Sequence, residues 1–446
     1  MSFWGRENEK CLIVDLLTEV RQSHSARLLA IIGRRRVGKT TLALQALKAS
    51  NSPCLYFFVP PYAVDRDLIN QWTTEVRRVL KLDTLPVCTR PIDLLAFLLQ
   101  YAEQNCFNLI LDESLTKNRL GTDFWTKFES LWMQYKNQSK LLCILIGSNQ
   151  LLSPPIPDGL HPLCHPFDLC IDLKPFETTL LTQIVDDHCP MATNDDLLDL
   201  YMMTGGVAQY VKNLLFLDGD SVEWIRRFFN PYGSFLHEGH LLLTDEFNRD
   251  FGLYYGLLEQ IASGVTKRQD LQAYFEGQIS GQLLRLESYY HLITKHTPLL
   301  APINQRGLRF RMTDQFLIFW LNTISAHIDL VESNRLDELK TKVEKALDAS
   351  RQHALIHFYE EKLTETKAYT AIGSWWSRDG QVEIDLIAVD EVNERIRFFE
   401  IKRNPKKIDI NALMTKSAAF FAANPKLRSY NATFEGLSLE DMRKPL

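Results

Sequence analysis

The chain has 446 residues and a formal net charge of −5 at pH 7, with 46% hydrophobic and 24% charged residues. This length predicts two to four domains of about 100–200 residues each, and the composition is typical of a soluble globular protein. The weakly acidic balance excludes a global basic field, so any contact with nucleic acid must be local. No apolar run reaches the roughly 18 residues of a membrane helix, and no apolar signal segment opens the chain. We therefore expect a cytoplasmic protein with no membrane partner.

Strand-like and helix-like runs alternate over the first part of the chain. The candidate strands lie at 28–32, 54–59, 107–112, 140–147 and 165–173. Helical stretches separate them at 72–82, 91–104 and 123–137. Strands that alternate with helices predict an α/β fold in which helices cover both faces of a parallel sheet.

A glycine-rich turn joins the first of these strands to a helix at 41–48. It fits the pattern Gly-x4-Gly-Lys-Ser/Thr and consists of Gly33, Arg34, Arg35, Arg36, Val37, Gly38, Lys39, Thr40 and Thr41. The backbone N–H groups of such a turn converge on an anion at the helix N-terminus. We expect Lys39 to reach the β- and γ-phosphates of ATP and the Thr40 hydroxyl to hold Mg2+. The alternative, a chance match, is disfavoured because the pattern lies between a strand and a helix.

Two acidic residues, Asp112 and Glu113, stand at the end of the apolar strand 107–112. Hydrolysis of a bound nucleotide needs a carboxylate that holds the metal and a group that activates water. We expect Asp112 to hold Mg2+ through water and Glu113 to polarise the attacking water. The alternative is a pair of solvated carboxylates, which the upstream phosphate loop disfavours.

The next strand, 140–147, leads into polar residues. Ser148 or Asn149 would point at the γ-phosphate or the attacking water, as a sensor-1 residue does. The alternative is a polar strand end that simply enters a loop.

Beyond about residue 217 the pattern is mainly helical. Three helical runs at 254–263, 267–275 and 278–292 precede extended pieces at 292–300 and 308–313. Three helices and a hairpin predict a winged helix-turn-helix. Its candidate recognition helix offers one arginine, Arg285, which is little for reading base edges. We expect a structural role or DNA contact of low specificity.

A second chemical pattern lies near the C-terminus. Asp385 falls in a strand at 382–389, and Glu400 and Lys402 fall in or just after a strand at 395–401. This is the Asp…Glu-x-Lys pattern of nucleases, in which Asp385 and Glu400 would hold Mg2+ and Lys402 would position the attacking water. The alternative is a solvated face of a hairpin.

One further carboxylate and several basic residues are candidates for this second site. Glu361, or its neighbour Glu360, is the candidate for an additional carboxylate from the helical stretch 331–366. Nearby basic residues either track a phosphate backbone or form a solvated face; they are Arg395, Arg397, Arg403, Lys406 and Lys407.

Four sequence motifs resemble those of one family. Gly5-Arg6-Glu7 resembles its N-terminal box, and Thr204–Tyr210 resembles its Gly-Gly-Val-Pro-x-Tyr lid motif, with Ala208 in place of proline. Phe310–Trp320 resembles the motif after its winged helix, and Gly373–Trp376 resembles its Gly-x-Trp-Trp segment. The family is the archaeal-type AAA+ P-loop ATPases, also found in bacteria, with a winged helix and a C-terminal restriction-endonuclease-like domain.

This resemblance implies three parts: an AAA+-like P-loop ATPase domain with the start of a helical lid at 1–215, a helical lid and winged helix at 216–330, and a linker helix and nuclease-like domain at 331–446. We expect an ATPase that uses ATP and Mg2+ and acts on DNA or RNA. The alternative is a nucleotide-dependent regulatory switch with an inactive nuclease fold. A homo-oligomer is a further candidate partner, and the alternative predicts that its assembly depends on the nucleotide.

Overall fold

The computed structural model describes residues 3–48, 50–61, 64–115, 119–147, 167–215, 224, 228, 235–247, 251–301 and 308–446. Contacts within the chain define two compact units, Met1–Pro175 and Phe176–Leu446. The three helices that follow Pro175 belong to the second unit, and they correspond to the start of the helical lid that the sequence analysis included in the segment 1–215.

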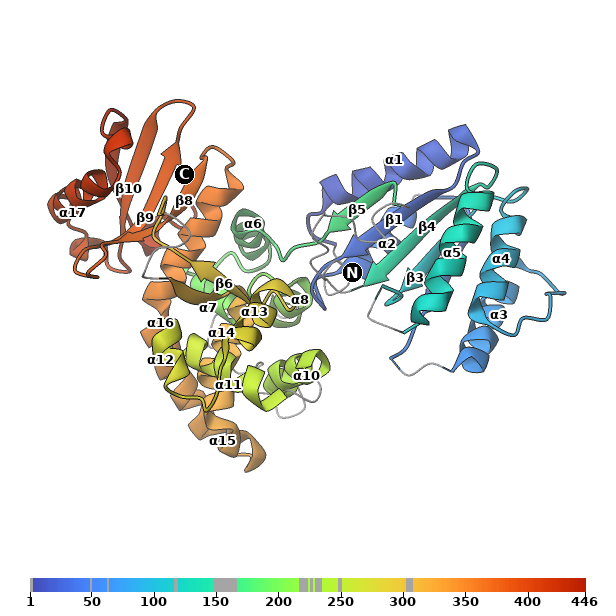
Figure 1. Cartoon of the computed structure of the whole chain (residues 1–446), viewed down its shortest axis with the longest axis horizontal. Helices are drawn as coiled ribbons and strands as arrows, with labels where there is room; N and C mark the ends of the chain where they lie inside the picture. The colour runs from blue at the N-terminus through green and yellow to red at the C-terminus, as the bar shows by residue number, and fades with distance from the viewer. Residues whose placement is uncertain are drawn as a thin grey trace. The chain divides into compact units, whose positions relative to one another are not determined.

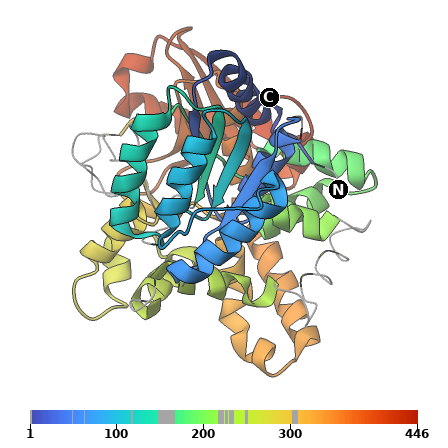
Figure 2. The same ribbon diagram turned by 90° about the vertical axis from the view of Figure 1, so that its right-hand side faces the viewer.

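A parallel sheet of five strands forms the centre of the first unit (Figures 1 and 2). Its strands are β1 (Arg27–Ile32), β2 (Cys54–Phe58), β3 (Phe107–Asp112), β4 (Leu141–Gly147) and β5 (Leu169–Asp172). They lie in the order β2-β3-β4-β1-β5, and every neighbouring pair is parallel. This confirms the predicted α/β class.

Helices cover both faces of this sheet. They are α1 (Glu7–Ser23), α2 (Lys39–Leu47), α3 (Asp65–Leu80), α4 (Pro91–Tyr101) and α5 (Gly121–Tyr135). Leu29 and Ile31 of β1 pack with α1 and α2, whereas Leu28 and Ala30 pack with α3, α4 and α5. Strands that are apolar on both faces are typical of such buried parallel sheets.

The second unit begins with a helical part that includes the predicted winged helix-turn-helix. Its elements are α6 (Thr178–His188), α7 (Asn194–Thr204), α8 (Ala208–Leu215), α10 (Phe235–Phe247), α11 (Phe251–Ala262), α12 (Arg268–Gln272), α13 (Ser280–Ser288), β6 (Ile293–His296), β7 (Arg309–Met312), α14 (Gln315–Thr323) and α15 (Ile328–Glu332). Helices α11, α12 and α13 precede the antiparallel hairpin of β6 and β7. Ala208, which replaces the proline of the resembled lid motif, opens α8, the position at which proline is favoured in helices.

A mixed sheet of four strands forms the C-terminal part of the second unit. Its elements are α16 (Leu336–Glu365), β8 (Ala371–Trp376), β9 (Glu383–Asp390), β10 (Arg395–Ile401), α17 (Ile410–Ala423) and β11 (Asn431–Leu437). The order is β11-β10-β9-β8, with β11 parallel to β10 and the other pairs antiparallel. In the described part of the chain, no helix has both the length and the apolar character needed to cross a membrane.

The hairpin of the winged helix contacts strand β8 at the edge of this mixed sheet. The His296 ring lies 3.2 Å from Ser374 Oγ, and the Leu299 N–H donates to the Ser374 carbonyl at 2.9 Å. Arg309 lies over the Trp376 ring at 4.1 Å and pairs with Glu383 at 3.1 Å. Burial, reinforced by Arg311, lowers the pKa of His296 to about 4. These contacts join the hairpin to the mixed sheet within the second unit.

Candidate functional site

The phosphate loop runs from the end of β1 to the start of α2, and two glycines allow its course. A Cβ atom on Gly33 would lie 2.4 Å from the Leu173 carbonyl oxygen, so no larger residue fits without a shift. Gly38 has a φ of 103°, a conformation that L-residues with a side chain rarely adopt. The loop backbone therefore turns tightly and delivers Lys39 as the first residue of α2.

Lys39 is the buried cation of this loop, with 6% of its surface exposed. Its Nζ donates to the Gly33 and Arg34 carbonyls, at 2.9 Å in both cases. Burial lowers the Lys39 pKa to about 8, while Glu113 and Asp112 act in the opposite direction. The structure thus places Lys39 within the electrostatic field of the two predicted catalytic carboxylates.

One carboxylate oxygen of Asp112 accepts hydrogen bonds from two hydroxyl groups. Thr40 Oγ1 and Tyr56 Oη each donate to Asp112 Oδ2 at 2.7 Å. A hydroxyl and a carboxylate are hard oxygen donors of the kind that Mg2+ prefers, so Thr40 and Asp112 fit this metal. The structure brings together the two side chains that the sequence assigned to Mg2+.

Tyr56 was not anticipated from the sequence. Asp112 pairs with Phe58 across β2 and β3, so Tyr56, two residues earlier, points to the same face of the sheet. Helices α3 and α4 separate these strands in the chain. The sequence therefore contains no local signal for this contact.

Glu113 occupies an unusual backbone position directly after β3. Its φ is 58°, and its N–H donates to Asp112 Oδ1 at 2.9 Å. A left-handed conformation costs free energy in a residue with a Cβ atom and is often found at functional sites. The Glu113 carboxylate lies 3.4 Å from Arg119, whose other Nη donates to the Val59 carbonyl at 2.6 Å. Arg119 is a second residue that sequence analysis missed.

The remaining residues of the predicted nucleotide site have diverse environments. Val37 is buried in the core beside α2, whereas Arg36 and Thr41 are exposed. Arg34 and Arg35 are half-buried, and the charge of Arg35 further lowers the Lys39 pKa. The predicted sensor residue Ser148 and its alternative Asn149 lie outside the described residues.

If this site hydrolyses ATP with Mg2+ as the sequence predicts, replacing Tyr56 with phenylalanine is expected to raise the Mg2+ concentration that half-saturates hydrolysis by about tenfold, because groups that hydrogen-bond a metal-binding carboxylate orient it. Binding of ATP without Mg2+ should change less than about twofold, since the phenol contacts the carboxylate rather than the loop. Titration of hydrolysis with Mg2+ and of fluorescent ATP in EDTA measures both quantities. Tyr135→Phe on α5, on the opposite face of the sheet, is the control. Equal Mg2+ requirements in both variants would exclude this role for Tyr56.

The C-terminal pattern also converges in space. Lys402 Nζ lies 2.9 Å from Asp385 Oδ2 and 3.0 Å from Glu400 Oε1. Asp385 Oδ2 also accepts the Ile401 N–H at 2.9 Å, and Lys416 lies 3.4 Å from Glu400. Burial lowers the Lys402 pKa, but the two carboxylates outweigh burial, and the net shift is upward. Asp385 and Glu400 are oxygen donors that fit Mg2+.

Glu361, the predicted additional carboxylate, is not joined to this group in the described structure. It lies 3.3 Å from His357, and Glu360 pairs with Arg311 of β7 at 2.6 Å. The α16 side chain at the end of β10 is instead Gln352, which donates to the Ile401 carbonyl at 2.7 Å. Residue 360 lies about 12 Å further along the helix than residue 352. Gln352 of α16 thus contacts the end of β10, and the contacts of the two glutamates are made with His357 and Arg311.

Two of the five predicted basic residues are engaged by carboxylates. Arg397 forms a two-bond pair with Glu435, at 2.9 and 2.7 Å. Arg403 pairs with Asp348 and Asp195. The other three residues are exposed and compatible with a phosphate backbone; they are Arg395, Lys406 and Lys407.

Comparisons of sequence relate the chain to archaeal and bacterial proteins. Residues 320–413 match the DUF234 family, described as "Archaea bacterial proteins of unknown function". An uncharacterized protein of Methanocaldococcus jannaschii, MJECL04, is 23% identical over 430 residues, which cover 91% of this chain and 90% of that relative.

Comparisons of structure relate the fold to P-loop ATPases. The Walker-type ATPase PABY2304 of Pyrococcus abyssi is 17% identical with a TM-score of 0.51, over 72% of this chain and 96% of the other. The ORC2 protein of Aeropyrum pernix, in ADPNP–ADP complexes, is 12% identical with a TM-score of 0.50, over 74% and 94%. The chain therefore shares its α/β fold, built on a five-stranded parallel sheet, with P-loop ATPases, and it also has a C-terminal mixed-sheet domain.

Proposed function

We propose that the first unit binds ATP with Mg2+ and hydrolyses it. The observation that carries this proposal is the shared position of Lys39, Thr40, Asp112 and Glu113 where β1 and β3 end, with Thr40 Oγ1 2.7 Å from Asp112. Ligands of open α/β sheets bind at the carboxyl ends of the strands. The fold shared with a Walker-type ATPase supports the same function.

Each of these residues has a distinct part in this mechanism. The loop N–H groups and Lys39 hold the phosphates and offset charge on the γ-phosphate during its transfer. Thr40 and Asp112 would hold Mg2+, which neutralises phosphate charge when bound. Glu113 orients the attacking water and accepts its proton. Tyr56 keeps the Asp112 carboxylate oriented toward Thr40.

For the second unit we propose a metal-dependent nuclease that acts on DNA or RNA. The pairing of Lys402 with both Asp385 and Glu400, at 2.9 and 3.0 Å, carries this part. The two carboxylates would hold Mg2+, and Lys402 would position water and offset charge on the phosphate. The exposed Lys406 and Lys407 supply local positive charge for a phosphate backbone.

The second candidate is a nucleotide-dependent switch with an inactive nuclease fold. It is favoured by the contact of Glu361 with His357 at 3.3 Å, because the predicted additional carboxylate has a partner outside the Asp385–Glu400–Lys402 group. In this case the nucleotide would control assembly into a homo-oligomer, in which a neighbouring subunit supplies an arginine to the γ-phosphate. Light scattering in ADP and in ATP separates the candidates, because a monomer in both nucleotides contradicts the switch.

The test of the ATPase is phosphate release from ATP by the full chain in Mg2+ and in EDTA. Glu113→Gln should lower turnover by about 10²- to 10³-fold, because general-base catalysis contributes about 10²- to 10⁴-fold, and should leave ATP affinity nearly unchanged. Glu129→Gln, an exposed position on α5, is the control. Turnover that survives in Glu113→Gln or in EDTA would contradict the proposal.

A further inference from the structure

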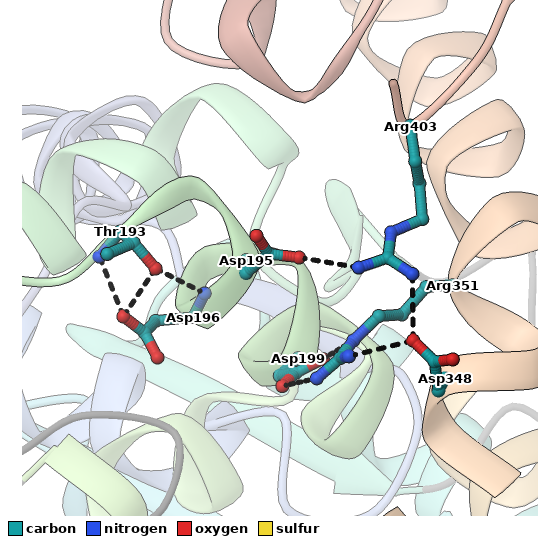
Figure 3. Close-up of polar contacts among 7 residues, drawn as sticks. All are labelled: Thr193, Asp195, Asp196, Asp199, Asp348, Arg351 and Arg403. Carbon is teal, nitrogen blue, oxygen red and sulfur yellow. Dashed lines mark hydrogen bonds and ion pairs between the residues drawn. The ribbon is translucent and has the colours of Figure 1, made fainter. Parts of the chain in front are cut away.

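A side chain of helix α7 forms an ion pair with Arg403, the residue that follows Lys402. Arg403 donates from one Nη to Asp195 of α7 at 3.1 Å and from the other to Asp348 of α16 at 2.8 Å (Figure 3). The Arg403 side chain therefore lies between two helices, and its backbone is one peptide away from the candidate catalytic lysine.

A second arginine continues this network into the protein interior. Arg351 of α16 donates two hydrogen bonds to Asp199, at 2.7 and 2.6 Å, and the Asp199 side chain is fully buried. Arg351 also lies 3.3 Å from Asp348, which therefore contacts both arginines (Figure 3). Asp195 and Asp199 are four residues apart on one face of α7. Helices α7 and α16 and the end of β10 are thus connected by one chain of ion pairs.

The backbone at Lys402 is held from α16 as well. Gln352 donates to the Ile401 carbonyl at 2.7 Å and accepts the Arg403 N–H at 3.1 Å. The Lys402 N–H donates to the Leu437 carbonyl at 3.0 Å. The backbone on both sides of Lys402, at Ile401 and Arg403, is therefore held by hydrogen bonds to α16. The Arg403 side chain adds a contact with α7.

Helix α7 is itself a well-anchored support. Its N-terminus has a capping box in which Thr193 and Asp196 exchange hydrogen bonds (Figure 3). Further along, the Tyr201 hydroxyl lies 2.6 Å from His357 Nδ1 of α16. A charged group on such a helix has a defined position, as a residue that supports a metal-binding site requires.

We propose that Asp195 and Arg403 are positioning residues for Lys402 and, through it, for the metal-binding pair Asp385 and Glu400. This inference rests on the proposed function of the C-terminal site. Helix α7, which leads into the Gly205-Gly206 lid motif, thereby contributes to the geometry of that site. About half of the Asp195 side chain is exposed, so its ion pair adds little to stability, and its loss should leave the fold intact.

The test measures binding of Mn2+ to the full chain by calorimetry without nucleotide. The binding that is lost in Asp385→Asn is assigned to the C-terminal site. Asp195→Asn and Arg403→Gln should each weaken this binding by about tenfold, as loss of outer-shell partners does. Arg403→Lys, which keeps the cation, should recover part of the affinity. Asp123→Asn is the matched control, because Asp123 also forms an exposed ion pair, with Lys127 of the same helix α5 in the first unit.

Equal Mn2+ affinity in Asp195→Asn, Asp123→Asn and wild type would overturn the inference, as would the absence of binding that depends on Asp385. Thermal unfolding of each variant checks the fold, and a general loss of stability with unchanged Mn2+ affinity also counts against it. Cleavage of DNA and RNA is assayed separately. Mn2+ binding that depends on Asp195, without cleavage, would leave the inference standing and refute the nuclease.

Discussion

Lys39→Ala is expected to lower ATP hydrolysis by at least about 10²- to 10³-fold, the effect of removing one preorganised charge-stabilising group. Lys39 Nζ is held by two loop carbonyls beside Asp112 and Glu113, and alanine cannot replace its charge at the γ-phosphate. Phosphate release under saturating Mg2+ measures the rate. Lys48→Ala, an exposed position at the end of α2, should retain the wild-type rate.

The pH dependence of ATP binding provides a second readout of Lys39. Burial lowers its pKa to about 8, so above this pH the free protein increasingly carries a neutral lysine. Phosphate binding favours the charged form and then requires proton uptake, so the affinity should fall as pH rises through 8, by up to about tenfold per pH unit. Binding in Lys39→Ala should lack this slope. A flat profile in the wild type would contradict the assignment.

Asp385→Asn is expected to abolish metal-dependent cleavage by the C-terminal domain, a loss on the order of 10³-fold if the metal contributes several kcal/mol. Asparagine keeps the shape of the side chain but removes the negative charge that Mg2+ and Lys402 require. The measurement is cleavage of plasmid, single-stranded DNA and RNA in Mg2+ or Mn2+, with and without ATP.

Glu391→Gln is the control for this substitution, because Glu391 is exposed directly after β9, the strand that carries Asp385. Cleavage that persists in Asp385→Asn would assign the chemistry to other residues. A wild-type protein that hydrolyses ATP and cuts no substrate would favour the nucleotide-dependent switch. A dependence of cleavage on ATP would show that the two sites communicate.

Functional groups whose positions are specified by their immediate neighbours in the chain could be predicted from the sequence. Lys39 and Thr40 follow a fixed spacing from Gly33, and Asp112 ends an apolar run, so their placement at a strand edge follows from local structure. Asp385 and Lys402 also converge as expected, because they lie in or beside adjacent strands of an antiparallel pair.

The contacts of Glu361, in contrast, are not specified by its neighbours in the sequence. Whether a side chain of α16 approaches Asp385 depends on which turn of this 30-residue helix lies against the sheet. The sequence indicated that α16 is a helix, but the packing of α16 places Gln352 at the end of β10. A helix advances about 1.5 Å per residue, so a small difference in packing changes which side chain reaches a site.

The sequence by itself determined the phosphate loop, the Asp112–Glu113 pair, the α/β class of the first unit and the Asp385–Lys402 pattern, because each depends on spacing within one or two neighbouring elements. The tertiary structure alone decided the Tyr56–Asp112 and Arg119–Glu113 contacts and the link from Asp195 to Arg403. Asp195 and Arg403 are separated by more than two hundred residues, and only the packing of α7 beside α16 brings them together. Such contacts depend on how elements pack, which local sequence patterns do not specify.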